Sequence, residues 1–144
     1  MRATFGAPVA RPRSPRATPS ACAPLTEAVL QEAREAYGDT SGAGDEKRQL
    51  SWSGTPYLRP ADAVRVARAA LAKDGNYNNF TPSLLAWLLG KHPVCARFAR
   101  ESSVVVYVRG AAPALQRIAA SARRARADEV VAFGDDGELR IWWD

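Results

Sequence analysis

Two different periods run through the C-terminal third of the chain. Residues 104–109 and 139–143 show the two-residue alternation that is typical of strands. Between them, apolar residues recur after Pro113 at the three- and four-residue spacing of a helix. Residues 130–133 form another short apolar run, and the turn-forming residues 134–137 join it to residues 139–143. The pattern therefore predicts a β-α-β-β unit.

The rest of the chain carries start and stop signals for further helices. Thr26 and Gly38 bound the first, and the Thr81-Pro82 pair is a strong helix start. The predicted helices span residues 27–37, 60–73, 83–89 and 93–101. Residues 49–59 read as a short hairpin that turns at Gly54-Thr55. Together these elements predict an α+β fold, with a small antiparallel sheet of about four strands packed with several helices.

Strand alternation divides the side chains of this sheet between two faces. The helix after Pro113 is expected to cover one face. Four side chains are expected together on the other face: Tyr107, Arg109, Arg140 and Trp142. They would form an open aromatic and basic platform. In the alternative, further helices cover this side, and the rings of Tyr107 and Trp142 are core residues. We expect Trp87 and Phe98, in other segments, to be core residues.

Charge divides the chain into three parts. Residues 1–24 carry four arginines and no acid, and we expect them to be a disordered basic tail. A transit peptide and a misassigned start codon are alternatives for this segment. Residues 25–48 are expected to be a peripheral helix with an acidic loop, and residues 49–144 the folded domain. The net charge of +5 favours polyanionic partners, although GC-rich coding would also give the excess of arginine.

The cysteines and the apolar runs bear on the compartment. Two cysteines, Cys22 and Cys95, are too few for a disulfide framework, and Cys22 lies in the segment expected to be disordered. We therefore expect a reducing, cytoplasmic environment. The longest apolar run, residues 84–89, is far shorter than the roughly 20 residues of a membrane span, so no membrane partner is expected.

Candidate catalytic chemistry is sparse. His92 is the single histidine and has no recognisable catalytic partners, and with Cys95 it offers two metal ligands where a closed zinc site needs four. The chain has no phosphate-binding loop and no dinucleotide fingerprint. We therefore expect no enzymatic activity, no catalytic residues, no metal and no cofactor.

Aromatic and basic residues are interleaved over the folded part of the chain. Single-strand binding needs rings that stack on bases and cations that follow phosphates, and each stacked base contributes about 1–3 kcal/mol. The candidate nucleic-acid-binding residues are Trp52, Tyr57, Arg59, Arg65, Arg68, Tyr77, Phe80, Tyr107, Arg109, Arg140 and Trp142. Duplex-reading motifs are absent from the sequence.

The order of segments over residues 50–143 resembles a known family. It runs through Ser-Trp-Ser-Gly-Thr-Pro-Tyr, an arginine-bearing helix, Val-Tyr-Val-Arg-Gly, a helix begun by proline, Ala-Asp-Glu-Val and Leu-Arg-Ile-Trp-Trp. This order is similar to that of the ThermoDBP single-stranded DNA-binding proteins of thermophilic archaea and their related proteins. The resemblance implies an apolar cleft that takes bases, basic residues on the phosphates, no cofactor and a homo-oligomer. The chain stops at Asp144, without the C-terminal zipper extension of some members.

The sequence thus predicts a noncatalytic protein that binds single-stranded DNA without reading its sequence. A protein-interaction or regulatory module with its aromatic residues inside is one alternative. RNA binding on the same surface is another.

Overall fold

The computed structural model describes residues 22–38, 51–72, 75–101, 103–133 and 137–144. Its helices are α1 (Glu27–Gly38), α2 (Pro60–Ala70), α3 (Pro82–Leu89) and α4 (Ala112–Arg124). Its strands are β1 (Ser51–Trp52), β2 (Cys95–Glu101), β3 (Val104–Arg109), β4 (Glu129–Phe133) and β5 (Glu138–Trp143). The predicted α+β class is confirmed, as is the order strand, helix, strand, strand at the C-terminus.

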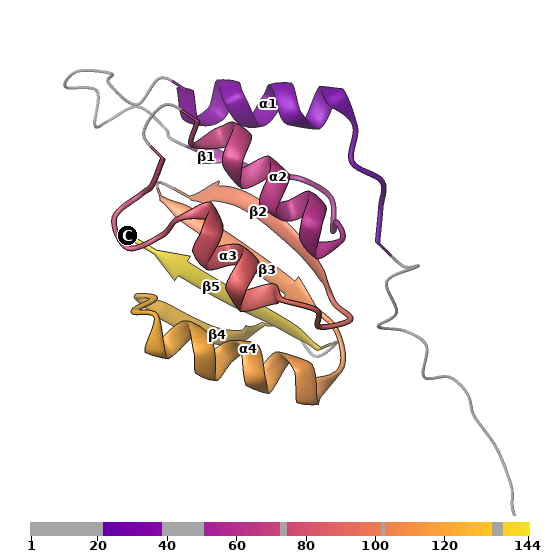
Figure 1. Cartoon of the computed structure of the whole chain (residues 1–144), viewed down its shortest axis with the longest axis vertical. Coiled ribbons are helices and arrows are strands. Elements are labelled where there is room, and N and C mark those ends of the chain that lie inside the picture. The colour runs from indigo at the N-terminus through magenta and orange to yellow at the C-terminus, as the bar shows by residue number, and fades with distance from the viewer. Residues whose placement is uncertain (1–21, 39–50, 73–74, 102, 134–136) are drawn as a thin grey trace, which may run out of the picture.

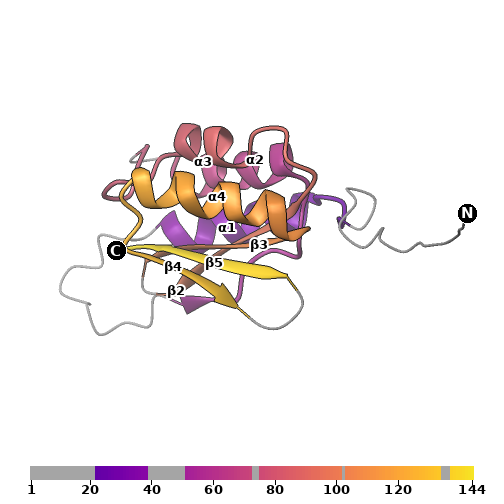
Figure 2. The ribbon, with the colours of Figure 1, turned by 90° about the horizontal axis from the view of Figure 1, so that it is seen from below.

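The strands form one antiparallel sheet in the order β1-β2-β3-β5-β4 (Figure 1). The four described helices all lie on the same side of this sheet (Figure 2). Most of the core lies between the two layers. It includes Phe80 and Trp143, which are fully buried with their ring centres 4.9 Å apart. The side chain of Thr81 accepts a hydrogen bond from the backbone of Leu84, as the predicted start of α3 requires.

Two predicted elements are wrong. Residues 95–101 form strand β2 and not a helix, and residues 95–100 pair with β3. Residues 51–58 do not fold back on themselves as a hairpin. They run beside β2 instead, through the pairs Trp52 with Arg100 and Leu58 with Ala96. Phe98, between these pairs, donates its backbone N–H to Oγ1 of Thr55.

One charged side chain lies in the core. Arg100 of β2 is 2% exposed, donates from Nη1 to the carbonyl of Ala36 at 2.8 Å and places its guanidinium 4.5 Å from the ring centre of Tyr37. It therefore meets the carbonyl-bearing end of α1, where a cation is favoured. Burial raises the pKa of Tyr37 far above its usual value, against the opposite effect of Arg100.

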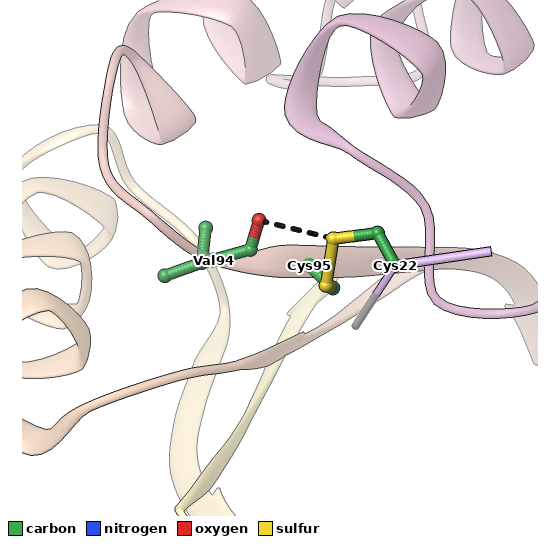
Figure 3. Close-up of a disulfide and its surroundings, with 3 residues drawn as sticks. All are labelled: Cys22, Val94 and Cys95. Carbon is green, nitrogen blue, oxygen red and sulfur yellow. Dashed lines mark hydrogen bonds between the residues drawn. A yellow bond between two sulfur atoms is a disulfide. The ribbon is translucent and has the colours of Figure 1, made fainter. Parts of the chain in front are cut away.

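The two cysteines are joined, contrary to the expectation of a reduced pair. Cys22 bonds to Cys95 at the start of β2, with Cα atoms 5.5 Å apart (Figure 3). Sγ of Cys22 also lies 3.7 Å from the carbonyl oxygen of Val94, which is a contact and not a true hydrogen bond, because a bonded sulfur has no proton to donate. The backbone of Ala23 donates to the carbonyl of Tyr57 at 2.7 Å. Residues 22 and 23 are therefore attached to the folded domain.

Several sequence-based predictions lie outside the described residues. They concern the tail over residues 1–21, the acidic loop over residues 39–50 and the turn at residues 134–136.

Candidate nucleic-acid interface

The side of the sheet that faces away from the helices is covered by no described element (Figure 2). Its side chains form rows across the strands, because paired residues of neighbouring strands point the same way. Tyr107 stands between Arg97 and Arg140 in one row. Val105 stands between Ala99 and Trp142 in the next. We call this surface the open sheet face.

Tyr57 lies at one border of the open sheet face, over the row that contains Arg109. The guanidinium of Arg109 is 3.9 Å from the centre of the Tyr57 ring, and the Tyr57 hydroxyl donates to Oε2 of Glu138 at 2.6 Å. Partial burial and then the hydrogen bond to Glu138 raise the pKa of Tyr57 well above its usual value. The phenol therefore keeps its proton and its neutral ring at physiological pH.

Tyr107 is held at the middle of the face. It is 6% exposed, with the guanidinium of Arg97 4.6 Å from its ring centre and its hydroxyl donating to Oε2 of Glu101 at 2.6 Å. Arg140 bridges two carboxylates, at 2.7 Å from Glu101 and 2.5 Å from Glu129. Arg140 is therefore already engaged in ion pairs.

Trp142 is half-buried beside this ion-pair network. The guanidinium of Arg140 lies 5.9 Å from its ring centre, and its Nε1 is buried with no hydrogen-bond partner among the described residues. Trp142 packs against the small apolar cluster of Ala99, Val105 and Tyr107. An acceptor that reached Nε1 would relieve the cost of the unpaired donor.

Within the described part of the chain, positive and negative side chains are equal in number on this surface. It carries three arginines, Arg97, Arg109 and Arg140, and three glutamates, Glu101, Glu129 and Glu138. The glutamates accept from Arg140, Tyr57 and Tyr107. Among the described residues, no carboxylate lies within ion-pair distance of Arg97 or Arg109. These two guanidinium groups are the cations of the open sheet face that no described carboxylate holds, although Arg97 donates from Nη2 to the carbonyl of Ser53.

The structure divides the candidate residues into two groups. Five of them belong to the open sheet face: Tyr57, Tyr107, Arg109, Arg140 and Trp142. The other six do not: Trp52, Arg59, Arg65, Arg68, Tyr77 and Phe80. Phe80 is fully buried, which removes it from any set of stacking residues. Trp52 and Tyr77 are half-buried and pack against the core on the helix side, and Arg59 is exposed at the start of α2.

The helix layer carries a second cationic surface. Arg65 and Arg68 line a groove between α2 and α3, together with Val64 and Leu89. Trp87 of α3 is 58% exposed, although we expected it to be a core residue. Phe98, for which we expected the same, is fully buried. The predicted binding residues thus lie on opposite sides of the domain.

Four charged residues of the open sheet face escaped the sequence analysis: Arg97, Glu101, Glu129 and Glu138. Arg97 and Glu101 belong to β2, which we predicted to be a helix, so their alternation with Ala99 was not used. Read as a strand, residues 95–101 place Arg97, Ala99 and Glu101 on the face of Tyr107. The two-residue alternation of a strand was present in this segment, but the segment was interpreted with the 3.6-residue period of a helix.

The network around Glu101 predicts a dependence of stability on pH. Partial burial raises the pKa of Glu101, whereas hydrogen bonds from Arg140 and Tyr107 lower it. The lowering is the larger effect, so the pKa of Glu101 lies below its usual value. A carboxylate with a lowered pKa stabilises the fold above its unfolded pKa of about 4.3, and this contribution is lost as the pH falls through the folded pKa.

We therefore expect Glu101→Gln to destabilise the protein at pH 6 and to cost progressively less below about pH 4. Urea unfolding at a series of pH values measures the difference from the unmodified protein. Glu35→Gln on the exposed side of α1 is the control, with a small effect that changes little with pH. An equal cost of Glu101→Gln at pH 6 and pH 3 would contradict the assignment.

The described residues contain no group of three histidine, cysteine or acidic side chains that could hold a metal ion. None of the described helices has the length and apolar character needed to cross a bilayer.

Comparisons with known proteins assign the chain to no family. The resemblance to the ThermoDBP proteins therefore rests on the order of sequence segments alone. Protein-family models, curated proteins and solved structures were compared with the chain, and none of them matches.

Proposed function

We propose that the open sheet face binds single-stranded DNA without reading its sequence. The observation that carries the proposal is the gathering of Tyr57, Tyr107 and Trp142 on one face that no described helix or strand covers, with Arg97 and Arg109 lying over two of the rings. Flat rings beside guanidinium groups match the two parts of a nucleotide, the base and its phosphate.

Binding would exchange one kind of ring contact for another. An arginine over an exposed ring contributes about 0.5–1 kcal/mol, whereas a base stacked on the ring contributes about 1–3 kcal/mol. Arg97 and Arg109 would swing from the rings to the phosphates and leave the ring of Tyr57 to a base. The movement of Arg97, which also breaks its hydrogen bond to the carbonyl of Ser53, would uncover the buried ring of Tyr107. Since Arg140 is held by Glu101 and Glu129, its role is to fix the position of the sheet residues around Trp142.

Fluorescence anisotropy with a labelled oligonucleotide at low salt tests this proposal. We expect Tyr57→Ala and Trp142→Ala each to raise Kd roughly 5- to 150-fold, the equivalent of 1–3 kcal/mol. Trp87→Ala is the matched control, because it removes an exposed ring from the opposite layer. Thermal unfolding of each variant separates lost stacking from lost folding.

Salt dependence gives an independent readout. Each phosphate contact that is removed flattens the slope of log K against log salt by about 0.7 for a single strand. Arg97→Gln and Arg109→Gln should each produce this change. Absence of binding at low salt would overturn the proposal, as would equal losses of affinity in Trp87→Ala and Trp142→Ala. Preferential competition by a matched RNA would assign the face to RNA instead.

A second candidate function is protein binding by the same face. The equal numbers of arginine and glutamate favour it, because a balanced surface rich in tyrosine, tryptophan and arginine is typical of protein interfaces. In that case oligonucleotides would not bind at any salt concentration, and the open sheet face would bind a protein of mixed surface charge.

The disulfide and the proposed function both bear on the cellular compartment. Disulfides persist in secreted proteins and inside hyperthermophiles, and are rare in other cytosols. We retain the cytoplasmic assignment only for a hyperthermophilic cell; the resemblance to the ThermoDBP family implies a thermophilic archaeon.

A further inference from the structure

The two edges of the sheet differ in how they are protected. At the first edge, β1 is two residues long and is followed by Pro56, which has no N–H to donate. Ala23 then pairs with Leu58 on its outer side, next to the disulfide. Short strands, proline and a covering segment are common means of preventing an edge from pairing with another chain.

The second edge has none of these protections among the described residues. Strand β4 spans Glu129–Phe133, pairs with β5 on one side and has no described neighbour on the other. It contains no proline, glycine, lysine or arginine. Val131 is 42% exposed, and Ala132 is exposed as well. A strand of this length and composition presents backbone groups and apolar side chains that another strand can cover.

An apolar pocket lies directly beside this edge. It has a volume of about 400 Å³ and opens between α4 and the β4-β5 pair. Ala112, Leu115 and Ala119 line it from α4, and Ala132 and Leu139 line it from the strands. Gln116 and Arg123 of α4 and Glu138 of β5 also line the pocket and add polar groups to its largely apolar wall. Ala132 belongs to both the edge strand and the pocket, whereas Val131, which pairs with Arg140, lies on the open sheet face.

We propose that two copies of the chain associate through β4, paired antiparallel about a two-fold axis at Val131. This register aligns all five residues of both strands and places Glu129 opposite position 133, so no like charges meet. A two-fold axis perpendicular to the sheet keeps both helix layers on one side, with the two α4 helices flanking the junction. The pockets of the two copies then lie on either side of the interface.

The open sheet faces of the two copies would join into one surface. This consequence bears on the proposed function, but the association itself requires only the edge and the pocket. A dimer that does not bind DNA would therefore contradict the proposed function and leave this inference intact. A monomer that binds DNA would do the reverse.

Sedimentation equilibrium of the full chain tests the proposal. We expect a dimer for the unmodified protein and for Trp87→Lys, which charges the other large exposed apolar side chain. We expect a monomer for Val131→Lys, because the two-fold axis would bring two ammonium groups together. Circular dichroism and thermal unfolding confirm that each variant is folded. A monomeric unmodified protein at millimolar concentration would overturn the proposal, as would a dimer that persists in Val131→Lys.

A crosslinking experiment tests the register. Residues directly opposite each other in an antiparallel pair have Cα atoms about 4.5–5.5 Å apart, within reach of a disulfide. Under mild oxidation, Val131→Cys should form a covalent dimer at least tenfold faster than Trp87→Cys. Equal rates for the two variants would overturn the two-fold register at Val131.

Discussion

Reduction of the Cys22–Cys95 disulfide is expected to lower the free energy of unfolding by about 4 kcal/mol. The bond joins residues separated by 73 positions and so restricts a long stretch of the unfolded chain. It also ties Ala23 to the outer side of Leu58, which completes one edge of the sheet. For a domain of this size, the loss corresponds to a decrease in Tm of roughly 10–20 °C.

Thermal unfolding with and without a phosphine reductant measures this effect. The Cys22→Ser/Cys95→Ser double variant should unfold near the Tm of the reduced protein and should not respond to the reductant. A Tm of the unmodified protein that is unchanged on reduction would show that the bond contributes nothing, and free-thiol titration would then establish whether it forms.

Gly54→Ala is expected to destabilise the protein by about 2–5 kcal/mol. Gly54 has φ of +99°, and a Cβ atom there would lie 2.6 Å from Cβ of Ala99 and 2.7 Å from the carbonyl oxygen of Phe98. The left-handed conformation costs an alanine about 1–2 kcal/mol, and overpacking adds about 1–3 kcal/mol. The position of Tyr57, three residues later, depends on this close approach to β2.

Gly75→Ala separates the two causes. Gly75 has φ of +79°, and a Cβ atom there would meet nothing within 4 Å. Urea unfolding should therefore show a loss of only about 1–2 kcal/mol for Gly75→Ala. Equal losses for the two variants would mean that segment 51–58 moves away from β2 at little cost.

The helices were predictable because their signals are local. Thr81 and Pro82 begin α3, and the stripe of Leu115 and Ile118 defines the buried side of α4. Strand β2 was not predictable in this way. A strand with one buried face is expected to alternate buried apolar residues with exposed polar ones. In β2 the charged Arg100 is buried on the core side, and Ala99 is buried on the opposite face. Alanine and arginine are also good helix formers, so local preference favoured the wrong element.

The candidate site was predictable to the extent that alternation decides it. The alternation in β3 and β5 predicts that four side chains share one face, and the register of the two strands agrees: Tyr107, Arg109, Arg140 and Trp142. It did not reveal that Glu101 and Glu129 hold Arg140, because those ion pairs join residues far apart in the sequence. The balance of charge on the face is a property of tertiary structure.

The strand order β3-β5-β4 has a consequence for biosynthesis. Strand β4 leaves the ribosome before β5, yet β5 is its one partner in the described sheet and also separates it from β3. Until residues 138–143 have emerged, a nascent chain therefore exposes both sides of β4 and the apolar side of α4. Translation at about 5–20 residues per second keeps this interval short. A pause that leaves β5 inside the exit tunnel after β4 has emerged would prolong it, and chaperone capture of stalled chains would increase accordingly.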